Sequence, residues 1–106
     1  MSDQIQVSHI LLMYDGSLRS TATRSQDEAK QKIEDIKAKI DGGGDFGEAA
    51  QANSDCPSSA QGGDLGSFGK GMMVPEFEDA AFTLDVGATS GVVETDFGYH
   101  LIMRTG

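Results

Sequence analysis

Cysteine and long apolar runs are scarce in these 106 residues. Cys56 is the only cysteine, which excludes an internal disulfide framework and a cysteine-rich zinc site. No apolar run approaches the ~20 residues of a membrane span, and Met1–Gln6 lacks the basic and apolar pattern of a secretory leader. We therefore expect a cytoplasmic protein that has no membrane partner.

Positive charge is also scarce. The chain carries 8 basic and 17 acidic residues, a net charge of −9. Residues 41–106 supply all of it, because eleven acidic side chains there face only Lys70 and Arg104. Nucleic-acid binding needs a basic surface, so this class of function is excluded, and an anionic membrane surface is disfavoured. The acidic excess is typical of a soluble surface.

Length and composition predict one globular domain over residues 1–106. Hydrophobic residues make up 38% and charged residues 24% of the chain, values typical of folded proteins. A chain of this size buries roughly 60–70% of its unfolded surface, enough for one modest core. We expect a monomer.

Apolar spacing and capping signals predict an α+β domain with a small antiparallel or mixed sheet. Strands are predicted at Ile5–Met13, Asp64–Phe68, Val92–Thr95 and Tyr99–Thr105. Capping residues predict helices after Ser25 and Asp45, and Pro75 is suited to the first turn of a third. The turn-rich segment Ser54–Gly63 has room for one further helical turn.

Two histidines and the cysteine are the residues best suited to chemistry. His9 and His100 lie among apolar neighbours in the first and last predicted strands. Taken singly, each is typical of a hydrogen-bonded core histidine, but the terminal strands of small α+β domains often pair, so the rings could meet. Cys56 is either a nucleophile or an ordinary loop cysteine. The scattered ligands disfavour a zinc site, and we expect no metal or cofactor.

The chain resembles the parvulin family of peptidyl-prolyl cis–trans isomerases from about Val7 to Thr105. The motifs that carry the resemblance, in order, are Ser8-His9-Ile10-Leu11, Arg24–Ala29, Asp45-Phe46, Ser54-Asp55-Cys56, Gly62–Phe68, Gly71-Met72-Met73, Phe77–Ala80, Gly87 and Thr95–Ile102. The resemblance implies a four-stranded antiparallel sheet surrounded by about four helices, in the order βαααβαββ. It also implies an enzyme that rotates X–Pro bonds in polypeptides and assists protein folding.

The resemblance implies roles for nine residues. His9, His100 and Thr95 match a hydrogen-bonded histidine pair with its supporting hydroxyl, and Cys56 matches the position that approaches the peptide bond. The positions that match the substrate-binding residues are Leu65, Met73, Phe77, Phe97 and Arg19. We expect the two histidine rings to lie within hydrogen-bonding reach of each other or to be linked through Thr95.

The same resemblance argues against a preference for phosphorylated substrates. Members of the family that read phosphate carry a basic cluster after the first strand, and here that segment offers Arg19 alone beside Asp15. A phosphate dianion needs several cationic donors. Phe97 replaces the small hydroxyl residue of the phosphate-directed branch. Arg24 is the other cation that could favour an acidic residue before proline.

Two other functions remain open from the sequence. The domain could be a proline-peptide binding module or small chaperone with negligible turnover, although the presence of both histidines and Cys56 argues against this. It could also be a Cys–His hydrolase or thiol enzyme. For an isomerase, rotation breaks no bond, so we expect the apolar pocket to desolvate the amide and the histidine pair to act electrostatically.

Overall fold

A computed structural model describes residues 4–16, 24–55, 57–69, 71 and 73–106 of the chain. The elements are β1 (Ile5–Leu12), α1 (Gln26–Asp41), α2 (Phe46–Asn53), the 3₁₀ helix η1 (Pro57–Gln61), β2 (Asp64–Phe68), α3 (Pro75–Phe82), β3 (Val93–Thr95) and β4 (Gly98–Arg104). This order confirms the predicted α+β class. The predicted helical turn after Ser54 is the 3₁₀ helix, so three helices are α-helical among the described residues.

The four strands form one antiparallel sheet in the order β2-β1-β4-β3. The central strands β1 and β4 are the first and last elements of the chain, as the sequence predicted. In their register His9 lies opposite Ile102, and Leu11 lies opposite His100. Residues directly opposite one another share a sheet face, so both histidines lie on the same face as diagonal neighbours.

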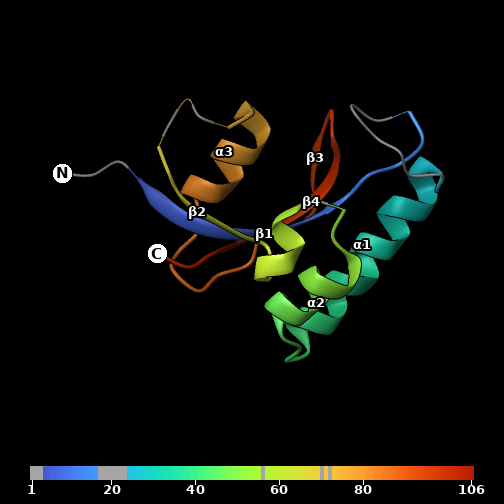
Figure 1. The fold of residues 1–106 in the computed structure, drawn as a ribbon, viewed down its shortest axis with the longest axis horizontal. Coiled ribbons are helices and arrows are strands. Elements are labelled where there is room, and N and C mark those ends of the chain that lie inside the picture. Colours follow the sequence, from blue (N-terminus) through green and yellow to red (C-terminus); the bar gives the residue numbers. More distant parts are fainter. Residues whose placement is uncertain (1–3, 17–23, 56, 70, 72) are drawn as a thin grey trace.

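Helices cover the two faces of the sheet separately (Figure 1). Ile10, Leu12 and Leu101 pack against α1 and α2 in one buried cluster. On the other face, Val7 and Ile102 pack with Phe77 of α3 in a second cluster. Strand β1 is therefore buried on both faces for most of its length, and only Gln6 within it is exposed. None of the described helices is long and apolar enough to cross a membrane.

Local sequence signals place the helices. The Ser25 hydroxyl accepts the Glu28 N–H and the Glu28 carboxylate accepts the Ser25 N–H, which completes the predicted capping box of α1. At α2, the Asp45 carboxylate caps the Gly47 N–H. Helix α3 starts at Pro75, whose missing N–H costs nothing in a first turn.

A β-bulge in β2 determines which residues of this strand lie on the sheet face that carries the histidines. Val7 pairs with Gly66 and Ser8 pairs with Asp64, so Leu65 is an extra residue in its strand. Gly66 has a φ of +72°, the left-handed conformation that a bulge of this kind requires. The bulge sends Leu65 to the face of Phe68, three positions along, and both side chains join the cluster under α3.

Candidate active site

The two histidines form a buried hydrogen-bonded pair in the sheet. The Nδ1 atoms of His9 and His100 are 3.3 Å apart, and the Nε2 atom of His100 is 2.7 Å from the Thr95 hydroxyl. All three residues are at most 6% exposed. The structure confirms the predicted contact between the rings and shows the predicted link to Thr95 as well.

Burial keeps both imidazoles neutral. Desolvation lowers the pKa of His9 from 6.5 to about 4. Desolvation, assisted by the neighbouring His9, lowers the pKa of His100 to about 3. A charged pair would also place two N–H donors against each other between the Nδ1 atoms, because an imidazolium donates from both nitrogens. At neutral pH one histidine therefore donates across the 3.3 Å contact and the other accepts.

The histidine pair has two possible tautomers, which differ in which of the two outer nitrogen atoms, Nε2 of His9 or Nε2 of His100, carries a proton. The Thr95 hydroxyl oxygen already accepts the N–H of Phe97. If the hydroxyl also donates to His100, the pair is oriented so that Nε2 of His9 carries a proton; the opposite orientation leaves that nitrogen with a lone pair. Nε2 of His9 is buried without a hydrogen-bond partner among the described residues. It is the free polar end of the network.

The Phe77 ring packs perpendicular to both rings of the histidine pair. Its centroid lies 5.6 Å from that of His9 and 5.4 Å from that of His100, with interplanar angles of 79° in both cases. This edge-to-face packing excludes water from both imidazoles. Phe68 packs against Phe77 in turn, and their ring centroids are 6.0 Å apart.

An apolar pocket of about 340 Å³ opens over this arrangement. Its walls come from β1, β2, β4, α3 and the segments that precede α3 and join β3 to β4. They comprise His9, Leu11, Leu65, Met73, Val74, Phe77, Phe97 and His100. Among the described residues of this lining, only the two histidines are ionisable, and both are neutral at pH 7. A pocket with this lining suits a compact apolar ring and removes water from whatever peptide bond adjoins it.

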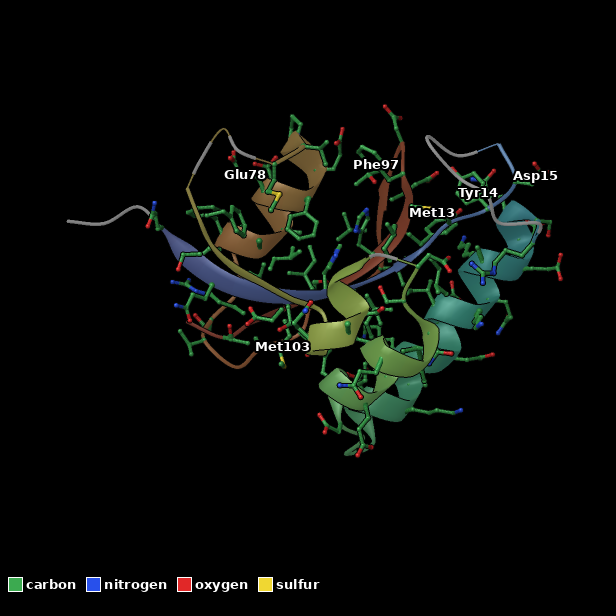
Figure 2. The ribbon with its side chains drawn as sticks, viewed as in Figure 1. Met13, Tyr14, Asp15, Glu78, Phe97 and Met103 are labelled. Carbon is green, nitrogen blue, oxygen red and sulfur yellow. The ribbon has the colours of Figure 1, made fainter. Side chains whose placement is uncertain are left out.

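Phe97 enters the pocket from a tight hairpin between β3 and β4. The turn is Asp96-Phe97, and Gly98 follows with a φ of +139°. A Cβ atom at Gly98 would lie 2.3 Å from the Leu12 carbonyl oxygen, so only glycine allows the hairpin to lie this close to β1. Figure 2 shows Phe97 at the tip of this hairpin, on the α3 side of the sheet.

The structure brings together seven of the nine predicted site residues. Three of them form the buried hydrogen-bonded network: His9, His100 and Thr95. The other four line the pocket: Leu65, Met73, Phe77 and Phe97. Cys56 and Arg19 lie outside the described residues. Arg24 is engaged by the Asp55 carboxylate, 2.5 Å from its Nη1 atom, rather than presented to the pocket.

Leu11 and Val74 also line the pocket but were not among the predicted site residues. Leu11 could have been found, because the alternation of the first strand places it on the face of His9. Val74 precedes α3 and carries no local signal. The role of Ser54 and Asp55 along β1 was also missed, since it depends on contacts between residues more than 40 positions apart.

The fold and the site together define a small α+β domain whose sheet holds a neutral histidine pair beneath an apolar pocket of about 340 Å³. Residues 1–105 match the family model of the PPIC-type PPIase domain. The chain is 40% identical to peptidyl-prolyl cis-trans isomerase Pin1 of Arabidopsis thaliana over 97% of its own length and 96% of that protein. The chain belongs to the PPIC-type, or parvulin, family and is a peptidyl-prolyl cis–trans isomerase.

Other relatives place the same domain in longer proteins. The chain is 48% identical to the foldase protein PrsA of a Geobacillus strain over 87% of its length, but spans only 33% of that protein. Among solved structures, peptidyl-prolyl isomerase ESS1 of Candida albicans superimposes with a TM-score of 0.91 at 38% identity, covering 98% of this chain and 63% of that one.

Proposed function

We propose that His9, Cys56, Thr95 and His100 are the catalytic residues of this isomerase. We propose further that Leu65, Met73, Phe77, Phe97 and Arg19 bind the substrate. The observation that supports this assignment is the apolar pocket over a neutral, buried histidine pair. The substrates are polypeptides with an X–Pro bond, and the reaction is rotation about that bond.

The pocket lowers the barrier by taking the proline ring out of water. The uncatalysed barrier is close to 20 kcal/mol because the C–N bond has partial double-bond character. Water stabilises the planar, more polar amide better than the twisted one, in which conjugation is lost. A pocket walled by Leu65, Met73 and Phe77 grips the ring and withdraws the adjoining bond from solvent.

The histidine pair supplies fixed dipoles rather than a proton. Both pKa values lie well below 7, so neither ring accepts a proton at neutral pH. Nε2 of His9, which has no hydrogen-bond partner among the described residues, is the atom of the network that is available to a polar group of the substrate. A network fixed by packing needs no reorganisation as the carbonyl twists, which is the condition for electrostatic catalysis.

We assign Cys56 an electrostatic role. Rotation about the C–N bond requires no acyl intermediate, so the partial negative charge of the sulfur is sufficient. The residue follows Asp55, which lies beside the end of β1.

We propose a broad substrate range without selection for phosphate. None of the described residues that line the pocket is a cation, and Arg24 is already paired with Asp55. Arg19 alone is too little positive charge for a phosphate dianion, which needs several cationic donors. Small and apolar residues before proline match the surroundings of Met73 and Phe97. The acidic chain, with its net charge of −9, adds a weak long-range repulsion of phosphorylated peptides.

We also propose that residues 1–106 act as one catalytic domain, as a monomer in the cytoplasm, without binding nucleic acid or membrane. The single cysteine suits a reducing compartment, and the acidic balance opposes polyanions. Sedimentation of the purified chain at micromolar concentration tests whether it is a monomer, and fractionation of the source cells tests its location. Titration with duplex DNA tests the absence of nucleic-acid binding.

A protease-coupled isomerisation assay tests the function across peptides that differ in the residue before proline. We expect turnover on Ala-Pro and Leu-Pro peptides and loss of at least tenfold in kcat/KM for Phe77→Ala. A binding module would bind the same peptides without accelerating the exchange. A thiol hydrolase would cleave an ester probe, lose that cleavage on alkylation of Cys56, and leave the X–Pro equilibration at its uncatalysed rate.

A further inference from the structure

The segment that joins β2 to α3 forms part of the pocket wall. Met73 and Val74, the last two residues of this segment, line the pocket together with Phe77 in the first turn of α3. Phe77 is buried within a helix, whereas Met73 lies outside the helices and strands and is only partly buried. The place of the Met73 side chain on the pocket wall therefore depends on how the segment is held.

Glu78 holds this segment at two points. The Oε1 atom of its carboxylate accepts a hydrogen bond from the Gly71 N–H, and its own N–H donates to the Val74 carbonyl oxygen at 3.0 Å. Figure 2 shows Glu78 on the side of α3 that faces the segment. Because Met73 lies in the chain between Gly71 and Val74, a single residue of α3 fixes the backbone on both sides of it.

The hydrogen bond from Gly71 to Glu78 is of a strong kind. A bond from an N–H to a carboxylate is charge-assisted and is roughly twice as strong as one between neutral groups. Glu78 is partly buried, so water competes less for its carboxylate than for that of a fully exposed residue. Gly71 has a φ of +88°, a left-handed conformation that glycine adopts without strain, so the turn that presents its N–H costs little.

We propose that Glu78 is a positioning residue of the substrate pocket, which holds Met73 in the pocket wall before the substrate binds. The inference rests on the role proposed above for Met73 in binding the proline ring. A wall residue that is already in place loses no conformational freedom on binding, so ordering it beforehand raises affinity. The ring keeps its shape while the amide twists, so misplacing Met73 weakens binding of the planar and the twisted substrate alike. Such a change raises KM and leaves kcat nearly unchanged.

A role of Glu78 confined to the stability of α3 would give a different result. Glu76 lies in the same first turn of α3 and carries the same charge, but its side chain is exposed. Glu76→Ala therefore removes the same charge from the same end of the helix, with the same effect on the helix dipole, and leaves the Gly71 contact in place. It is the matched control, and if Glu78 serves only the helix, the two alanine variants should behave alike.

The test measures kcat and KM separately on an Ala-Pro peptide, together with the methyl NMR signal of Met73, in the full chain. We expect Glu78→Ala to raise KM about fivefold with kcat little changed, as one side chain that must be ordered on binding would. The Met73 methyl signal should shift or broaden in Glu78→Ala and stay as in the wild type in Glu76→Ala. Glu78→Gln, which keeps an oxygen acceptor at the same reach, should keep KM within about twofold of the wild type.

Glu78→Asp separates reach from charge. It keeps the carboxylate but shortens the side chain by one methylene, so it should raise KM as Glu78→Ala does, and it carries the same test if Glu78→Ala does not fold. The proposal is overturned if KM and the Met73 signal of folded Glu78→Ala match those of Glu76→Ala, or if Glu78→Gln is as impaired as Glu78→Ala. A wild-type KM in Met73→Ala would instead contradict the substrate-binding role proposed for Met73 itself.

Discussion

Acidification should unfold this protein through its two buried histidines. Each has a pKa of about 6.5 in the unfolded chain, and in the folded chain the values are about 4 for His9 and about 3 for His100. A group whose pKa is lower in the folded state binds fewer protons there than in the unfolded state. The free energy of unfolding therefore decreases as the pH falls below 6.5, and the decrease ends only below the folded values.

The size of the effect follows from the unfolded pKa. At pH 5 both folded histidines remain neutral, whereas the unfolded ones are almost fully charged. Each histidine then destabilises the fold by about 2 kcal/mol relative to pH 7.5, or about 4 kcal/mol for the pair. That is a large part of the 5–15 kcal/mol or so by which a typical domain is stable.

Urea unfolding at pH 7.5, 6.5, 5.5 and 5.0, at constant ionic strength, measures this directly. Most carboxylates titrate below this range, and protonating a chain of net charge −9 lowers its self-repulsion, an effect of the opposite sign. The control is His9→Leu/His100→Leu, which should lose the slope between pH 7.5 and 5. A wild-type change of less than about 1 kcal/mol, or a slope that survives in the double variant, would refute the reasoning.

Three further predictions concern single positions and substrates. Gly98→Ala should lower the free energy of unfolding in urea by at least about 2 kcal/mol, because φ is +139° and a Cβ would clash with the Leu12 carbonyl. Gly91→Ala is the control, and it should change stability little because a Cβ there meets open space. Equal effects of the two substitutions would argue against the tight hairpin. Cys56→Ser should reduce turnover, and Cys56→Asp should retain more of it; inactivity of the aspartate variant together with a trapped thioester in the wild type would show covalent catalysis instead. Phosphorylated Ser-Pro peptides should not exceed Ala-Pro peptides in kcat/KM; a hundredfold gain, about 2.7 kcal/mol, that disappears in Arg19→Ala would show that one arginine suffices for phosphate.

Elements with local signals were predictable from the sequence. The capping box of Ser25 and Glu28 fixed the start of α1, and Pro75 fixed the start of α3. The strands were placed to within about one residue at most ends, because alternation and branched residues mark them. The pairing of the first and last strands also followed from the order of elements together with the family resemblance.

Features set by distant contacts could not be read from the sequence. The bulge that places Leu65 in the pocket depends on how β2 pairs with β1. Gly66, with its positive φ, is the only neighbouring residue whose type indicates a bulge. The partnership of Ser54 and Asp55 with β1 likewise has no local pattern. Arg24 looked like a spare cation, but its partner Asp55 lies 31 positions away. Burial on both faces of β1 was missed because alternation reports only one face.

The most direct test of the account is the pH dependence of catalysis on an Ala-Pro peptide, followed by exchange NMR without a coupling protease. In the proposed mechanism the histidine pair stays neutral and no proton moves during rotation. We therefore expect kcat/KM of the folded enzyme to be constant from pH 7.0 to 5.5, with a solvent deuterium isotope effect near one, because the pKa values of His9 and His100 lie near 4 and 3. A loss of activity with a midpoint near pH 6.5 would show that one histidine titrates normally and would contradict the account.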